Sequence, residues 1–236
     1  MATYNCPGSV GRVVFGVDEA GKGPVLGSMF AAAVRVAEPD ILPAGVDDSK
    51  RLAPERREAL AAELRADDRV AVGVAEIPVA RIDDPETDMN TLTVAAHAEA
   101  AAEVLGPDER GATGLLDAGD TSEQRFARRV ADRLPAAVDL TARHGADEDH
   151  AVVGAASVVA KVARDAHVEA LAAASADEYG PAFGDLGSGY PSDPTTREFL
   201  DSFVAAFGEL PDCARRSWST CEDVLAEAEQ SGLGEF

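Results

Sequence analysis

A long amphipathic stretch between residues 151 and 174 limits the folds that this chain can adopt. Small apolar residues recur there at three- and four-residue steps, the spacing that brings side chains to one face of an α-helix. They are Val152, Ala155, Ala156, Val159, Ala163, Ala166 and Ala170. The pattern predicts a long helix with one buried face.

Short apolar runs earlier in the chain are typical of strands. Residues 12–18 are rich in β-branched side chains and bounded by glycines, and residues 25–36 are small and apolar. Only a glycine-rich bend separates the two runs, so we expect them to pair as neighbours in a hairpin. The sheet therefore begins antiparallel, with further strands expected at residues 70–77 and 114–117.

Helices are expected to alternate with the later strands. Residues 54–65 begin with Pro54, which suits a first helical turn, and residues 90–105 are rich in alanine. Residues 180–194 are dense in Gly, Pro, Ser and Asp and indicate a loop, after which one or two helices follow. The order of elements predicts the α/β class, a mixed sheet with helices packed on it.

A domain boundary is expected near Phe207, between residues 1–207 and a small C-terminal helical segment, 208–236. The length of 236 residues and the 46% of hydrophobic residues suit one compact domain with such an appendage. The sequence contains neither an internal repeat nor a low-complexity linker.

The charge of the chain is strongly acidic, with 43 Asp and Glu against 21 Lys and Arg, a formal net charge of −22. Only three of the basic residues are lysines: Lys22, Lys50 and Lys161. An acid-rich, lysine-poor surface suits a concentrated salt solution, where charges on the chain repel one another less. We therefore expect adaptation to a high-salt cytoplasm; an acidic mesophilic protein without such adaptation is the alternative.

The cysteines indicate neither a disulfide scaffold nor a structural zinc site. Cys6, Cys213 and Cys221 are odd in number and widely separated, without a CxxC pair. The first ten residues lack the basic and apolar segments of a leader, and the longest apolar run, 29–34, is short. We expect a soluble, cytoplasmic protein.

Four acids stand at unusual places: Asp18 and Glu19 at one strand end, Asp117 at another, and Asp165 on the polar side of the long helix. If the four converge, their mutual repulsion favours a hard divalent cation such as Mg²⁺ or Mn²⁺. Solvated surface acids are the alternative for each one taken singly. The strand period of two also directs Asp18 and Glu19 to opposite faces unless the chain bends there.

The bend after the first strand, Gly21-Lys22-Gly23, allows a close backbone approach to a sugar or phosphate. It is neither a Walker loop nor a dinucleotide fingerprint, and a plain tight turn explains it equally well. All three lysines lie in or beside the segments with candidate functional residues: Lys22 in the bend, Lys50 in Asp48-Ser-Lys50, and Lys161 four residues before Asp165. A weak ion pair with Asp165 is the alternative role for Lys161. A compact ammonium meets a phosphate as a point charge.

Together these segments resemble the type 2 ribonucleases H, the ribonuclease HII family, in order and spacing from about Val13 to Trp218. The matching segments are Asp18-Glu-Ala-Gly-Lys-Gly-Pro24, Asp48-Ser-Lys-Arg-Leu52, Leu116-Asp117, Ala155-Ala-Ser-Val-Val-Ala-Lys-Val-Ala-Arg-Asp165, Gly187-Ser-Gly-Tyr-Pro-Ser-Asp193 and Arg216-Ser-Trp218. The resemblance implies a ribonuclease H-like mixed sheet flanked by helices.

The resemblance also implies an endonuclease that cuts the RNA strand of RNA/DNA hybrids and cuts 5′ to single ribonucleotides embedded in duplex DNA. Cleavage by two divalent ions, Mg²⁺ or Mn²⁺, is expected to leave 3′-hydroxyl and 5′-phosphate ends.

By position, Asp18, Glu19, Asp117 and Asp165 match the family's metal-binding catalytic acids. Gly21, Lys22 and Gly23 match the motif that reads the ribose 2′-hydroxyl, with lysine where the family usually has arginine. Tyr190 matches the tyrosine that packs on the following sugar. Lys50 and Lys161 are expected near substrate phosphates.

Two other functions stay open. A metal-dependent phosphoryl hydrolase acting on a small ester would use Asp117 and Asp120 as a DxxD pair, and a noncatalytic protein would only bind hybrid duplexes. The nuclease interpretation predicts nucleic-acid duplexes as partners, a monomer, and no membrane association. A contact with a sliding clamp is left open because the last residues, 232–236, contain no clear clamp-binding motif.

Overall fold

The computed structural model describes residues 14–46, 52–106 and 111–233. Cys6 and Lys50 lie outside these ranges. The described part of the chain forms two compact units. The first comprises residues up to 19, 31–75 and 94–160, and the second comprises residues 20–30, 76–93 and 161–236.

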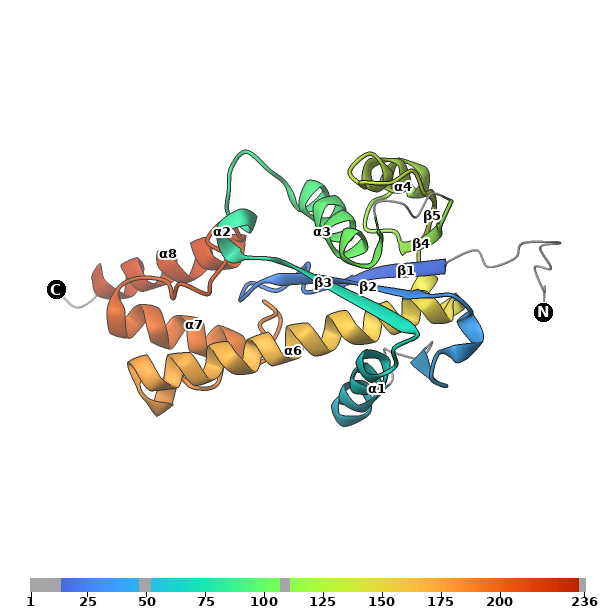
Figure 1. Ribbon diagram of the computed structural model, residues 1–236. Helices are drawn as coiled ribbons and strands as arrows, with labels where there is room; N and C mark the ends of the chain where they lie inside the picture. Colours follow the sequence, from blue (N-terminus) through green and yellow to red (C-terminus); the bar gives the residue numbers. More distant parts are fainter. Residues whose placement is uncertain (1–13, 47–51, 107–110, 234–236) are drawn as a thin grey trace. The chain divides into compact units, whose positions relative to one another are not determined.

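Five strands form one mixed sheet in the order β3-β2-β1-β4-β5 (Figure 1). Their bounds are β1 Val14–Ala20, β2 Met29–Val36, β3 Val70–Ile77, β4 Thr113–Asp117 and β5 Asp139–Arg143. β1 pairs with β4 and β4 pairs with β5, both in parallel. β1 and β2 are neighbours joined by a short connection, which suits antiparallel pairing because a parallel crossover needs a longer one. The sheet thus confirms the expected fold class.

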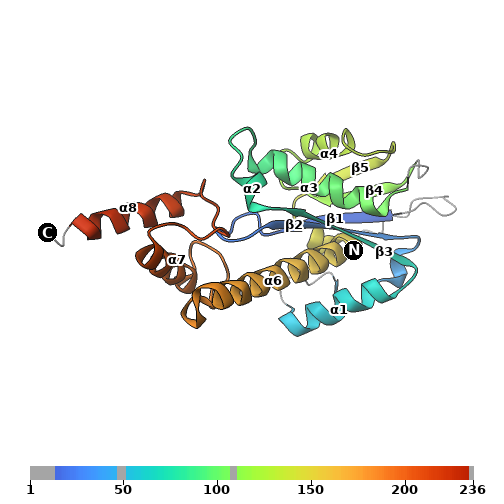
Figure 2. The same ribbon diagram turned by 60° about the vertical axis from the view of Figure 1, so that its left-hand side comes forward.

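The helices of the first unit cover both faces of the sheet. Helix α1, Pro54–Ala66, lies on one face with the beginning of α6, Ala151–Tyr179. Helices α3, Met89–Val104, and α4, Glu123–Ala131, lie on the other face, as the turned view in Figure 2 also shows. A short helix, α5, spans Ala146–Asp149. This layering buries residues of both sheet faces.

Close packing of α6 on the sheet depends on Gly16 in the middle of β1. A Cβ atom at this position would lie 2.5 Å from the backbone carbonyl of Val152, so only glycine fits. Phe15 and Val17 on either side are fully buried. The end of β1, which carries Asp18 and Glu19, is therefore fixed by tight contact between β1 and the first turn of α6.

The second unit has its own apolar core, formed largely by α7, Pro194–Phe207, and α8, Ser219–Leu233. Phe199, Phe203 and Phe207 share one side of α7, and the rings of Phe203 and Phe207 lie 4.6 Å apart. The remaining short elements are α2, Val79–Ile82, and 3₁₀ turns at Pro39–Ile41 and Pro181–Phe183. The expected boundary near Phe207 coincides with the end of α7. That this boundary separates a catalytic domain from a C-terminal segment stays a prediction.

The second strand is shorter than expected, beginning at Met29 rather than at Val25. The backbone N–H groups of Val25 and Leu26 donate instead to the carbonyl of Gly189, and Leu26 forms an isolated bridge with Ala214. Contacts with distant segments therefore override the local strand pattern. The long helix extends to Tyr179, five residues beyond its expected end at residue 174.

Helix α4 and strand β5 were absent from the expectations. In α4, the four arginines in or just after the helix obscure the apolar pattern of its short buried face, Phe126, Ala127 and Val130. In β5, only two residues are apolar, Leu140 and Ala142, which is too few to predict a strand. In the ranges that the structure describes, no helix is both long and apolar enough to cross a membrane.

Candidate active site

Two of the predicted acids follow directly on paired residues of neighbouring strands. Val17 of β1 pairs with Leu116 of β4, and the next residues are Asp18 and Asp117. Because the two strands are parallel, both acids lie at the same edge of the sheet. Asp18 is buried, with 5% exposure, and its Oδ1 accepts a 2.7 Å hydrogen bond from the backbone N–H of Glu19.

Glu19 reaches the same region through a contact with α3. Its Oε2 lies 2.7 Å from Nε2 of His97, whose side chain is fully buried. Strand geometry sends Asp18 and Glu19 to opposite faces, and His97 receives the carboxylate on the α3 side. Glu19 is also close enough for its charge to raise the pKa of Asp117.

Asp117 is held in place by the segment that follows β5. The backbone N–H of Ala146 donates a 2.8 Å hydrogen bond to its Oδ1. Burial raises the pKa of Asp117, and the charges of Glu19 and Asp147 act in the same direction, whereas the Ala146 hydrogen bond opposes them. The ionised carboxylate is thus destabilised by its surroundings, which a nearby cation would reverse.

Sequence reasoning did not identify His97. It is a lone histidine in an alanine-rich helix, 78 residues from Glu19, so no local pattern connects the two. The ring also makes an edge contact with Phe126 of α4 at 5.0 Å between centroids. Since Nε2 faces a carboxylate, it carries the proton in the neutral ring and donates to Glu19.

The donor chemistry of Asp18, Glu19 and Asp117 fits a hard divalent cation, because all three offer carboxylate oxygens. Burial and mutual repulsion at Asp117 give such a cation a further electrostatic advantage. Within the described residues, no group of three or more His, Cys, Asp and Glu side chains is arranged to hold a metal ion. The three acids are therefore gathered at one sheet edge without a closed coordination geometry.

The fourth predicted acid, Asp165, is exposed on α6 and belongs to the second unit, as does Lys161. Its approach to the three acids of the first unit stays a prediction. The structure leaves the role of Lys161 untested, and Lys50 falls outside the described residues.

The glycine bend belongs to the second unit, where a buried arginine organises it. Arg215 is fully buried, and its guanidinium donates to the carbonyl oxygens of Gly21 at 2.6 Å, Lys22 at 3.1 Å and Gly27 at 2.8 Å. Gly21 has a φ of +88°, a conformation that favours glycine. The hydrogen bonds from Arg215 thus hold the bend in a defined conformation.

Tyr190 lies beside this bend. A Cβ atom built on Gly23 would lie 3.6 Å from Cε1 of Tyr190. Tyr190 itself is 45% exposed to solvent. The carbonyl of Gly189 accepts hydrogen bonds from Val25 and Leu26, which joins the two loops. The structure therefore brings Gly23 and Tyr190 together, with an aromatic ring available to a ligand.

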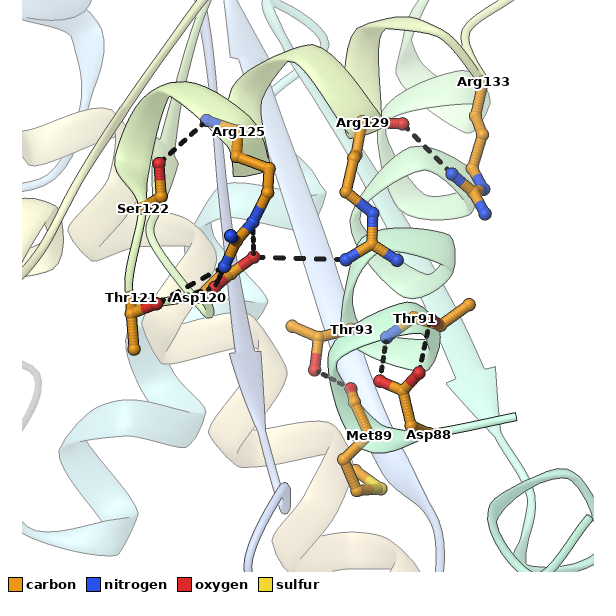
Figure 3. A network of polar contacts seen from close by, with 10 residues as sticks. All are labelled: Asp88, Met89, Thr91, Thr93, Asp120, Thr121, Ser122, Arg125, Arg129 and Arg133. Atoms are coloured by element: carbon orange, nitrogen blue, oxygen red, sulfur yellow. Dashed lines mark hydrogen bonds and ion pairs between the residues drawn. The ribbon is translucent and has the colours of Figure 1, made fainter. Parts of the chain in front are cut away.

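Asp120, the second acid of the alternative DxxD pair, serves a structural role. Its carboxylate is buried and binds Arg125 through contacts of 2.5 and 2.9 Å, with Arg129 at 4.0 Å (Figure 3). Arg125 lowers the pKa of Asp120 by hydrogen bonding and by charge. The carboxylate is occupied by the first turns of α4, which disfavours the small-ester hydrolase.

Comparison with known families identifies one match over most of the chain. The family described as Ribonuclease HII matches residues 15–221. Curated relatives with the same name come from Haloarcula marismortui, 63% identical, and Halobacterium salinarum, 62% identical. Each alignment covers 94% of this chain and 99% of the relative.

Solved structures show the same likeness in three dimensions. The ribonuclease H2 of Pyrococcus horikoshii matches with a TM-score of 0.78 and 32% identity, covering 92% of this chain and 99% of that protein. A structure described as the PCNA:RNase HII complex from Archaeoglobus fulgidus matches with a TM-score of 0.75 and 33% identity, over 89% and 96% of the two chains. Both relatives are matched over nearly their full length.

Proposed function

The chain belongs to the ribonuclease HII family and is a ribonuclease H, and on that premise we propose that it cuts 5′ to single ribonucleotides embedded in duplex DNA, as well as within longer RNA/DNA hybrids. Family membership supports endonuclease activity on the RNA of such hybrids. The observation that carries the proposal is the register of β1 and β4, which brings Asp18 and Asp117 to one sheet edge beside Glu19.

Asp18, Glu19, Asp117 and Asp165 are the proposed ligands for divalent ions, Mg²⁺ or Mn²⁺. When bound, two such ions supply an activated water and charge stabilisation for the scissile phosphate and the leaving 3′-oxygen. The chain positions its own ligands: His97 holds Glu19, and the Ala146 N–H holds Asp117. Both restraints reduce the side-chain freedom lost when substrate and ions bind.

Recognition of the ribose is assigned to Gly21, Lys22 and Gly23, with Tyr190 packing on the following sugar. The 2′-hydroxyl distinguishes RNA from DNA, and backbone groups at a glycine bend can approach it closely. The adjacency of Gly23 and the exposed Tyr190 ring supports this assignment. Lys50 and Lys161 are proposed to contact substrate phosphates.

Two aspects of the cellular setting belong to the same proposal. A sliding clamp is a candidate partner, since a solved relative is described in complex with PCNA. The protein is also proposed to be a cytoplasmic monomer adapted to high salt. The net charge of −22 and the relatives from halophilic archaea support the adaptation to salt.

The test uses a labelled DNA duplex containing one ribonucleotide, incubated with the protein in high KCl with Mg²⁺ or Mn²⁺. We expect cleavage immediately 5′ to the ribose, no cleavage of an all-DNA duplex, and loss of activity in Asp117→Asn. A folded protein that cuts neither this duplex nor a long hybrid in any metal and salt would contradict the proposal and favour a noncatalytic binder.

A further inference from the structure

A hollow of about 670 Å³ lies between helix α4 and the edge strand β5 in the first unit. Glu123, Gln124, Ala127, Arg128 and Ala131 of α4 line one side, and the residues of β5 line the other. The size is within the range of ligand-binding sites, about 300–1,000 Å³. We call this hollow the α4–β5 groove.

The groove lies in a basic segment of an acidic chain. Residues 123–143 contain five arginines, Arg125, Arg128, Arg129, Arg133 and Arg143, against three acids, Glu123, Asp132 and Asp139. The whole chain has twice as many acids as bases, 43 against 21. The balance is therefore reversed in this segment, which favours the binding of a polyanion there despite the acidic character of the whole chain.

Two of these arginines line the groove and are exposed: Arg128 from α4 and Arg143 from β5. In contrast to Arg125, which binds Asp120, neither side chain forms an ion pair with a carboxylate of the described residues. Glu123 on the groove wall already accepts a 2.9 Å hydrogen bond from the backbone N–H of His144. Both guanidinium groups can thus meet an external acceptor.

The groove begins next to the candidate active site. Arg143 is the register partner of Asp117 across β4 and β5, and β5 runs from there to Asp139. Five strand residues extend about 13 Å, enough for more than one phosphate of a strand that rises about 3.4 Å per nucleotide. A nucleic-acid strand that places one phosphate at Asp117 can continue along this groove.

We propose that the α4–β5 groove binds the phosphate backbone of the substrate beyond the cleavage position, through Arg128 and Arg143. The proposal rests on the proposed function, because it assumes that the scissile phosphate binds at Asp117. An acidic peptide that pairs with β5 as an additional strand is the alternative occupant. It is less suitable, because β5 is a short edge strand and its exposed charged residues, Asp139 and Arg143, disfavour pairing with another strand.

The test measures how substrate binding depends on salt. The binding constant for a ribonucleotide-containing duplex is measured over a series of KCl concentrations, with Asp117→Asn present in every protein to prevent cleavage. Each phosphate contact contributes about 0.9 to the slope of log K against log salt. The double variant Arg128→Gln, Arg143→Gln should therefore flatten this slope by about 1.8 and weaken binding at low salt.

A matched control removes two exposed arginines from the opposite face of the same unit, Arg56→Gln and Arg65→Gln on α1. The control changes net charge equally and should leave the slope within about 0.3 of the parent. Thermal unfolding verifies the fold of each variant, and the two single substitutions replace the double one if it unfolds.

Equal slopes for the groove variant and the control would overturn the proposal, as would weakened binding of an acidic peptide with unchanged duplex binding. A cleavage assay of the wild-type protein distinguishes failure of the groove proposal from failure of the proposed function. Cleavage of a ribonucleotide duplex by the wild-type protein with an unchanged slope would refute the groove alone. Absence of any cleavage by the wild-type protein would refute the proposed function.

Discussion

The guanidinium of Arg215 donates a 2.6 Å hydrogen bond to the carbonyl oxygen of Gly21, 194 residues earlier in the chain. It also binds the carbonyl of Lys22. A trans peptide directs the following N–H opposite to the carbonyl, and the described residues contain no cis peptide bond. The N–H groups of Lys22 and Gly23 therefore point away from Arg215, and the proposed function requires the ribose to approach from that side.

Replacing Arg215 by lysine should impair both folding and ribose selectivity. Burial lowers the pKa of Arg215 to about 10, so the group remains charged at neutral pH, and lysine cannot satisfy three carbonyls in the same planar arrangement. We expect the free energy of unfolding in urea to fall by about 2 kcal/mol or more, because buried carbonyls lose charged donors.

The effect on ribose selectivity is measured as the ratio of the cleavage rate at a single ribonucleotide to the cleavage rate of a long hybrid. We expect this ratio to change in Arg215→Lys. It should not change in the control Arg197→Lys, because Arg197 is a more exposed residue on α7. A destabilised but equally selective enzyme would show that Arg215 supports only the fold.

Removing the charge of Asp117 and removing that of Asp120 should have opposite effects on stability and on cleavage. Asp117→Asn should abolish cleavage and, in metal-free buffer, leave stability equal or higher, because burial and Glu19 disfavour its ionised form. Asp120→Asn should lower stability, because Arg125 loses its partner, and should retain cleavage. Parallel unfolding and cleavage assays check both.

The pH dependence of stability provides a further check on Asp120. Its folded-state pKa is depressed by Arg125, so the carboxylate stabilises the fold above the ordinary range near 3.8 and loses this effect as the pH falls through the lower folded value. The wild type and Asp120→Asn should therefore converge in stability at strongly acidic pH. Complete loss of cleavage in a folded Asp120→Asn would instead revive the DxxD hydrolase.

The fold class and the positions of Asp18 and Asp117 toward the ends of strands could be predicted, because they depend on local patterns and on a resemblance in motif order. The register of β1 against β4, the contact between His97 and Glu19, and the support of Gly21 by Arg215 could not, since each joins residues far apart in sequence. For α4 a signal existed. Ser122 precedes the helix and binds the N–H of Arg125, and Phe126 and Val130 share one face.

Helix α1 lacks a capping side chain, and adding one should stabilise the protein. Ala53 occupies the N-cap with φ −63° and ψ 151°, and it accepts hydrogen bonds only through its carbonyl. In Ala53→Ser the added hydroxyl can accept from the N–H of Arg56. We expect the free energy of unfolding to rise by about 1 kcal/mol, measured in urea, with unchanged activity.

A control for the cap is Ala62→Ser, on an exposed position of the same helix, where serine should be neutral or slightly destabilising. Equal effects of the two substitutions would show that the N-terminus of α1 gains nothing from a cap.

The acidic composition predicts that salt stabilises the fold. With a net charge of −22, like charges repel one another across about 10 Å at 0.1 M salt, and this range shrinks to about 3 Å at 1 M. The midpoint of thermal unfolding should therefore rise over this interval of KCl. Sulfate also strengthens burial by its exclusion from protein surfaces, whereas screening depends on ionic strength alone. Thermal unfolding in KCl and in potassium sulfate at equal ionic strength separates the two effects. Similar unfolding midpoints in the two salts would indicate screening. Stabilisation by sulfate but not by KCl would contradict the role assigned to the surface acids.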